Sequence, residues 1–103
     1  MAGRRRTSMR SAMTEHILDD AAHLIVWAVR RAIDFDDPTE LEEGPAWLAA
    51  RLASTALALD VLRQALREAV RALEADEEYA LALSLAAGFA SDTEALLRRT
   101  AAA

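Results

Sequence analysis

The clearest apolar pattern in the first third of the chain has the period of an α-helix. When successive residues are placed about 100° apart, one broad face collects Ile17, Leu18, Ala21, Leu24, Ile25, Ala28, Val29 and Ala32. The opposite face is polar and charged, and it carries one large ring, Trp27. Because Thr14 is a suitable N-cap, the sequence predicts an amphipathic helix from Glu15 to about Ile33.

A longer helix is predicted from Pro45 to about Ala75. Apolar residues recur there in steps of four and three, the spacing of a coiled-coil seam, at Leu48, Leu52, Leu59, Leu62, Leu66, Ala69 and Leu73, with Thr55 in the same row. The first half of this helix has a second apolar face, formed by Ala50, Ala53, Leu57 and Val61 with Trp47 beside it. A helix that is apolar on more than one face needs burial on more than one side, which predicts contact with a second copy or a partner protein.

Turn and cap signals divide the rest of the chain. Asp37, Pro38 and Glu40 predict a short helix that Gly44 ends before Pro45 opens the long one, and Phe35 and Leu41 are expected to hold this turn on the core. A third helix, capped by Asp76, is apolar nearly all round from Tyr79 to Ala90. Residues 91–94, Ser-Asp-Thr-Glu, have the form of a capping box. We therefore expect a break near residues 88–91 and a short last helix, or a kink past Gly88.

The composition supports an all-helical fold. The 103 residues are 53% hydrophobic, contain only three Gly and two Pro, and have few β-branched residues, which suits helices. A chain of this length forms one domain. The expected fold is all-α: an antiparallel bundle of three long helices with one or two short helices, in a single domain at residues 14–103 that dimerises through its central helix.

The interface candidates follow from the apolar positions that such a bundle leaves without a partner. They are Trp27, Trp47, Ala50, Ala53, Leu57 and Val61. A large aromatic ring on a polar helix face is typical of an interface anchor, although the N-terminal arm or the acidic linker of the same chain would also cover Trp27. Trp47 is more typical of a core residue, but it borders the second apolar face and is included for that reason.

Charge is unevenly distributed along the chain. Residues 1–12 contain four arginines and no acid, whereas the remainder holds eight arginines and seventeen acidic residues, so that a net charge of −5 combines a basic arm with an acidic body. Residues 1–13 are expected to be a flexible arm. Its arginines would favour a nucleic-acid backbone, the acidic body would oppose it, and no helix carries a basic stripe. The arginines concerned are Arg4, Arg5, Arg6 and Arg10.

The residue types that most catalytic sites need are scarce. There is no Cys, no Lys and no Gly-rich phosphate loop, so we predict neither an enzyme nor a cofactor. His16, Asp19, Asp20 and His23 share a helix face at a spacing that zinc accepts, but a solvated face with His–Asp pairs explains them better and no metal is predicted. The acidic linker fails as a calcium loop, because Pro38 and Thr39 occupy its fifth and sixth positions.

These observations favour a small cytoplasmic interaction or assembly module, acting as a homo-oligomer or as a partner-binding accessory factor. The alternative is a nucleic-acid-associated regulator that uses the N-terminal arginines. No membrane partner is expected, because the longest nearly uncharged run, Tyr79 to Ser91, is shorter than the roughly 20 residues of a spanning helix.

Overall fold

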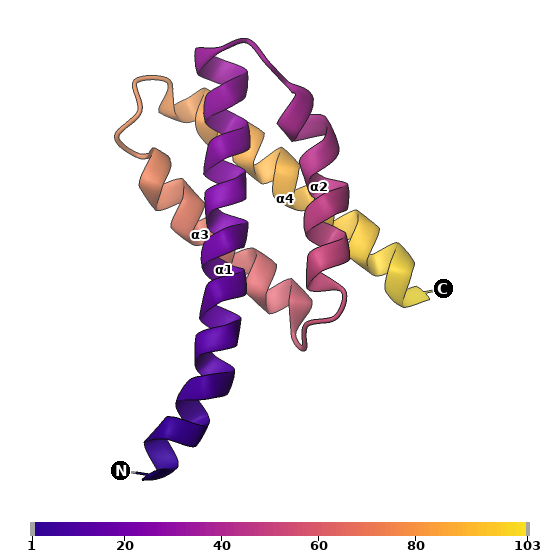
Figure 1. The fold of residues 1–103 in the computed structure, drawn as a ribbon. Helices are drawn as coiled ribbons and strands as arrows, with labels where there is room; N and C mark the ends of the chain where they lie inside the picture. The colour runs from indigo at the N-terminus through magenta and orange to yellow at the C-terminus, as the bar shows by residue number, and fades with distance from the viewer. Residues whose placement is uncertain (1, 103) are drawn as a thin grey trace.

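The computed structural model describes the backbone of residues 2–102 and the side chains of residues 16–101. Within residues 2–102 the chain forms four helices and no strand: α1 (Ala2–Asp34), α2 (Thr39–Leu52), α3 (Ala58–Leu73) and α4 (Tyr79–Ala102). In Figure 1, α1 and α2 lie side by side and antiparallel, and α3 and α4 cross behind them. The smallest dimension of the molecule is 17 Å, about the thickness of two helix layers. The prediction of an all-α fold is confirmed.

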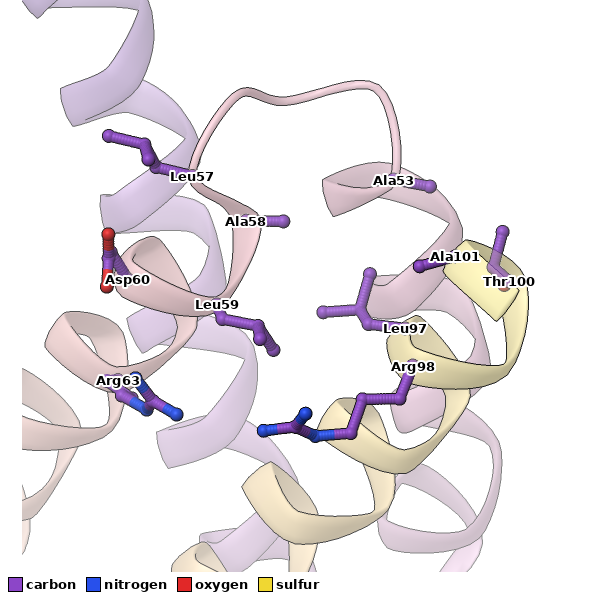
Figure 2. A pocket seen from close by; sticks show the side chains of 10 residues that line it. All are labelled: Ala53, Leu57, Ala58, Leu59, Asp60, Arg63, Leu97, Arg98, Thr100 and Ala101. Atoms are coloured by element: carbon purple, nitrogen blue, oxygen red, sulfur yellow. The ribbon is translucent and has the colours of Figure 1, made fainter. Parts of the chain in front are cut away.

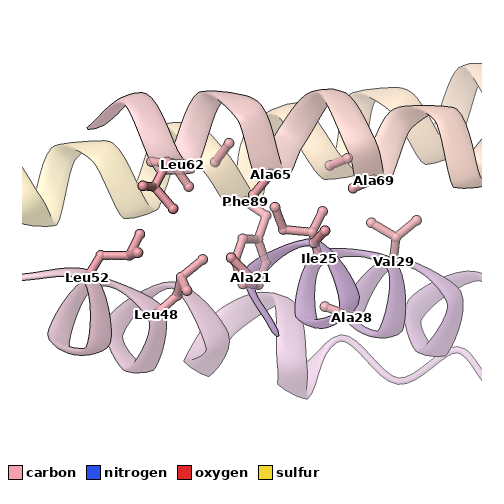
Figure 3. Close-up of a cluster of buried hydrophobic side chains, with 14 of the residues drawn as sticks. Ala21, Ile25, Ala28, Val29, Leu48, Leu52, Leu62, Ala65, Ala69 and Phe89 are labelled. Carbon is pink, nitrogen blue, oxygen red and sulfur yellow. The ribbon is translucent and has the colours of Figure 1, made fainter. Parts of the chain in front are cut away.

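The core lies between the α1–α2 pair and the α3–α4 pair. Ala21, Ile25 and Val29, from the predicted apolar face of α1, are fully buried and face Ala65 and Ala69 of α3 (Figure 3). Small residues on α3 allow the two helices to approach closely. The largest fully buried side chains are Phe89, Ile25, Leu48, Leu52, Leu62, Leu73 and Val29. Each such burial stabilises the fold by about 1.5–3 kcal/mol.

The predicted helix from Pro45 to Ala75 is wrong, because the chain reverses at residues 53–57. Here α2 ends at Leu52, the Thr55 amide donates a hydrogen bond to the Leu52 carbonyl, and Leu57 adopts the left-handed region with φ 59° before α3 begins. Ser54 and Thr55 favour such a turn because their hydroxyls compete with helical hydrogen bonding. The seam residues Leu48 and Leu62 are buried as predicted, but on two helices.

Gly44 and Pro45 do not separate two helices either; both are buried inside α2. Gly44 lies against α4, where a Cβ added to it would meet Cε2 and Cζ of Phe89 at 2.6 and 2.8 Å. Glycine is therefore needed at this crossing of α2 and α4. Close packing between these helices outweighs the cost of proline in a helix interior, about 3 kcal/mol.

The predicted break near residues 88–91 is also wrong, since α4 continues from Tyr79 to Ala102. The predicted capping box at residues 91–94 does not begin a new helix, and Thr93 within it faces the core. Its side chain is fully buried, and its hydroxyl donates a hydrogen bond of 2.8 Å to the Phe89 carbonyl one turn earlier. Asp76, predicted to cap this helix, instead accepts hydrogen bonds from Arg30 of α1 at 3.3 and 3.4 Å.

α1 begins at Ala2, well before the predicted start at Glu15, and ends one residue after the predicted Ile33. Its N-terminal turns extend beyond the other three helices (Figure 1). The residues expected to form a flexible arm thus belong to α1. The first described side chain of the core is that of Leu18.

Candidate interaction surface

Three of the five aromatic residues of the chain lie at the surface. Trp27 is 55% exposed, Phe35 71% and Trp47 55%. Aromatic side chains of this size remove 150–250 Å² from water when they are buried, and this chain leaves much of that area uncovered. The exposure of Trp27 agrees with its predicted place on the polar face of its helix. The expectation that Trp47 belongs to the core is wrong.

The two tryptophans lie along the seam between α1 and α2. Asp20, Leu24 and Trp27 follow one side of α1, because they recur every three or four residues. The ion pair between Arg51 Nη2 and Asp20 Oδ2, at 3.2 Å, joins that side to α2. Leu24 lines a shallow cleft of about 330 Å³ together with Trp47 and three other residues of α2, Glu40, Glu43 and Gly44. We call Trp27, Phe35, Trp47, Arg31 and Arg51 the aromatic surface.

Arginine side chains cover the rings of this surface. The Arg31 guanidinium carbon lies 5.3 Å from the centroid of the Trp27 ring and 5.6 Å from that of Phe35, and the Arg51 guanidinium carbon lies 5.6 Å from the Trp47 ring centroid. These are cation–π distances, each worth about 0.5–1 kcal/mol at exposed sites. The rings are therefore held in defined orientations while they remain accessible.

Asp37 fixes the position of Arg31. Its Oδ2 accepts a 2.9 Å hydrogen bond from Arg31 Nη2, and its Oδ1 accepts one of 3.1 Å from the Thr39 amide at the start of α2. The Thr39 side chain, the Arg31 guanidinium and the Thr39 amide lower the pKa of Asp37 to about 2. Asp37 was expected to be the N-cap of this helix, but Pro38 occupies that position, and Asp37 accepts the Thr39 amide from one residue before it.

The structure separates the other predicted interface residues. Ala50 and Ala53 are exposed on and just after α2, and Leu57 is 73% exposed in the turn. Val61 is buried within its own chain and does not belong to the surface. The four residues do not form one strip, because the helix that would align them is broken at residues 53–57.

Sequence reasoning missed Phe35 and the two arginines. Phe35 was expected to hold the turn on the core, but its ring lies outside it and against Arg31. The signal was present in the spacing: Trp27, Arg31 and Phe35 follow one another at intervals of four residues, which places them on one helix face.

A second apolar area lies where the α2–α3 turn meets the end of α4. This open groove of about 880 Å³ has Leu59 and Leu97 pointing into it from opposite sides, while the Leu57 side chain is directed away (Figure 2). Arg63 and Arg98 approach each other at one end. Both contact Glu94, at 3.8 and 3.2 Å, so that carboxylate offsets part of their charge.

The other chemical candidates can be placed only in part. His23 Nδ1 lies 2.7 Å from the backbone oxygen of Asp19 rather than from a carboxylate, and His16 is exposed. Over the side chains that the structure describes, no three His, Asp or Glu residues are grouped to hold a metal. The side chains of the N-terminal arginines, Arg4, Arg5, Arg6 and Arg10, lie outside the described residues.

α4 requires one correction to the sequence analysis. By length and composition alone, Tyr79–Ala101 is apolar enough to cross a membrane, because a spanning window tolerates a few charges that end an uncharged run. The core helix of a soluble protein passes the same test, and α4 contributes Ala82, Ala86 and Phe89 to the core. Leu81 and Leu83 on its outer side are exposed.

Comparison with known protein families, curated proteins and solved structures finds no match to this chain.

Proposed function

We propose that this chain is a small protein-interaction module that works as a homo-oligomer, most simply a two-fold dimer, and that the aromatic surface is its contact. The observation that carries the proposal is the exposure of Trp27, Phe35 and Trp47, each more than half accessible. Tryptophan and arginine are the residues most enriched among those that dominate binding energy at interfaces.

The arrangement of side chains around the rings supports a binding role for the exposed rings. Arg31 and Arg51 hold the rings in place, and the Arg51–Asp20 ion pair ties α2 to α1. Side chains already ordered in the free protein lose less entropy when they bind. A surface built in this way is prepared for a contact.

The charges beside the rings favour a second copy as the partner. Acidic residues, Asp20, Glu40 and Glu43, and the cations Arg31 and Arg51 lie on the two helices that form the seam. Two-fold contacts need a surface that is complementary to itself, and a patch with both signs of charge meets that need. A surface of one sign would favour a partner of the opposite sign.

The mass of the protein in solution tests the proposal. Light scattering over a concentration series is expected to give twice the 11.2 kDa of one chain, and Trp47→Asp is expected to give a single chain with unchanged helix content. Leu81→Asp is the matched control, because Leu81 is similarly exposed, at 47%, but lies on α4. Wild-type protein that stays at the mass of one chain at all concentrations would refute the proposal.

Intrinsic fluorescence gives an independent measurement. Both tryptophans of the chain belong to the aromatic surface, so their emission reports on that surface alone. Dilution below the dissociation constant is expected to shift the emission to longer wavelength as the rings return to water. Emission that does not change while the mass halves would place the contact elsewhere on the molecule.

A further inference from the structure

The outer side of α2 carries opposite charges at equal distances from its tryptophan. Glu43 lies one helical turn before Trp47 and Arg51 one turn after it, and small residues, Ala46 and Ala50, lie between them. All five side chains are exposed. We call these five residues the α2 strip. The repeat of three and four residues aligns them along one side of the helix.

Arg51 is positioned to serve a contact outside its own chain. Its Nη2 atom donates to Asp20 Oδ2 at 3.2 Å, and its guanidinium lies over the Trp47 ring. A guanidinium has several N–H donors in a fixed plane, so the bond to Asp20 leaves others for a second carboxylate. The side chain is still 48% exposed.

From this arrangement we infer the geometry of self-association: α2 packs antiparallel against α2 of a second copy, with Trp47 beside the two-fold axis. An axis at Trp47 places Glu43 of each copy opposite Arg51 of the other, so two ion pairs form. This inference rests on the proposed function, because it describes the contact by which the dimer forms.

Other arrangements of the same two helices fit the charges less well. Parallel helices would place Glu43 beside Glu43 and Arg51 beside Arg51, and such like-charge contacts disfavour association. An antiparallel pair shifted by one turn would place Glu43 or Arg51 opposite Trp47 of the other copy, so neither ion pair would form. Ala46 and Ala50 permit the close approach that the antiparallel pairing requires, and each leaves space for the Trp47 ring of the opposite copy.

Charge reversal tests this geometry through complementation. Glu43→Arg alone places Arg beside Arg in a dimer of two identical copies, and Arg51→Glu alone places Glu beside Glu. Each variant alone is expected to dimerise about tenfold more weakly than wild type. An equimolar mixture is expected to restore wild-type affinity, because in the mixed dimer every Arg faces a Glu. The double variant Glu43→Arg/Arg51→Glu is expected to dimerise with itself.

Two controls carry the same change of charge away from the α2 strip. Glu74→Arg and Arg71→Glu alter exposed residues at the end of α3 and just beyond it, and both are expected to keep the wild-type dissociation constant. Arg51→Glu also removes the bond to Asp20, but the mixture contains that same variant. Recovery in the mixture therefore cannot come from repair of the fold.

The outcomes separate the inference from the proposal beneath it. Wild-type protein that never associates overturns both. A wild-type dimer that both single variants preserve, or a mixture that stays dissociated, overturns the antiparallel α2 contact while the proposed function stands. The measurement is the dissociation constant from sedimentation equilibrium of each variant and of the mixture.

Discussion

At the scale of single residues, Arg31 and Asp37 link the end of α1 to the start of α2. Arg31 lies over two aromatic rings and donates to Asp37, whose other oxygen accepts the Thr39 amide. One carboxylate thus positions a cation of the aromatic surface and satisfies a free N–H group at the start of a helix, where negative charge is favourable.

This arrangement predicts a dependence of stability on pH. The pKa of Asp37 falls from 3.8 to about 2 in the folded chain, so its carboxylate stabilises the fold fully above the unfolded pKa. That contribution is lost as the pH falls from about 4 toward 2. Asp37→Asn lacks it. We expect the difference in unfolding free energy between wild type and Asp37→Asn to shrink over this range in urea titrations. A constant difference from pH 5 to pH 2 would contradict the role given to Asp37.

Leu57 shows what residue types alone could not reveal. A left-handed backbone usually signals itself through Gly or Asn, but here a leucine adopts φ 59° and leaves 73% of its surface in water. The sequence around it, with Ala53, Ala56 and Ala58, has high helix propensity. Ser54 and Thr55 are the local residues that favour a turn here, and neither residue type marks Leu57 as the left-handed position.

At the scale of elements, the sequence predicted which faces of the helices are buried better than it predicted where each helix begins and ends. The apolar face of α1 was correct because a long amphipathic repeat depends on many residues at once, and Ile25 and Val29 are buried as expected. The end of α2, the passage through Pro45 and the continuity of α4 were missed. The passage of α2 through Gly44 and Pro45 accompanies a close approach of Gly44 to Phe89 of α4, a contact between distant segments that no local pattern contains.

The residues of the candidate surface were likewise predicted only in part. Trp27 was recognisable because a large ring on a charged helix face is visible in the sequence. Phe35 was expected to pack on the core, and Trp47 was included among the interface candidates although it was more typical of a core residue. The exposure of both follows from where α2 lies against α1. Val61 was assigned to the surface because the predicted helix placed it on the same face as Ala50, and the turn at residues 53–57 removes that relation.

Substitution by alanine is expected to have opposite effects on stability at Gly44 and Gly88, the two glycines whose neighbouring atoms the structure describes. Gly44→Ala places a Cβ within 3 Å of the buried Phe89 ring, and such overpacking costs about 1–3 kcal/mol. The gain in helix propensity offsets only part of this cost. Gly88→Ala meets nothing within 4 Å on the exposed side of α4 and is expected to stabilise by about 0.5–1 kcal/mol. Chemical denaturation of both variants at one protein concentration measures the two effects. Equal stabilisation by both would show that α2 and α4 do not cross at Gly44.

At the scale of the whole molecule, thinness explains why so many apolar groups remain exposed. With a smallest dimension of 17 Å, the fold has two layers of helices and no layer that is covered on both sides. Every helix keeps an outer face in water, and the aromatic surface lies on the outer side of the α1–α2 layer. A second copy against that layer would convert two layers into a thicker and better-buried assembly.

Removal of residues 1–12 tests how the basic end of the chain relates to this assembly. The shortened chain keeps every described core residue, the first of which is Leu18, and the whole aromatic surface. We therefore expect its dissociation constant and helix content per remaining residue to match those of wild type.

The same variant tests the nucleic-acid alternative. Its net charge becomes −9, because four arginines and no acid are lost. Any retention of the full chain on duplex DNA at low salt is therefore expected to disappear. Loss of the dimer together with residues 1–12 would instead place the contact on the N-terminal turns of α1, and retention on DNA without those residues would contradict the nucleic-acid alternative.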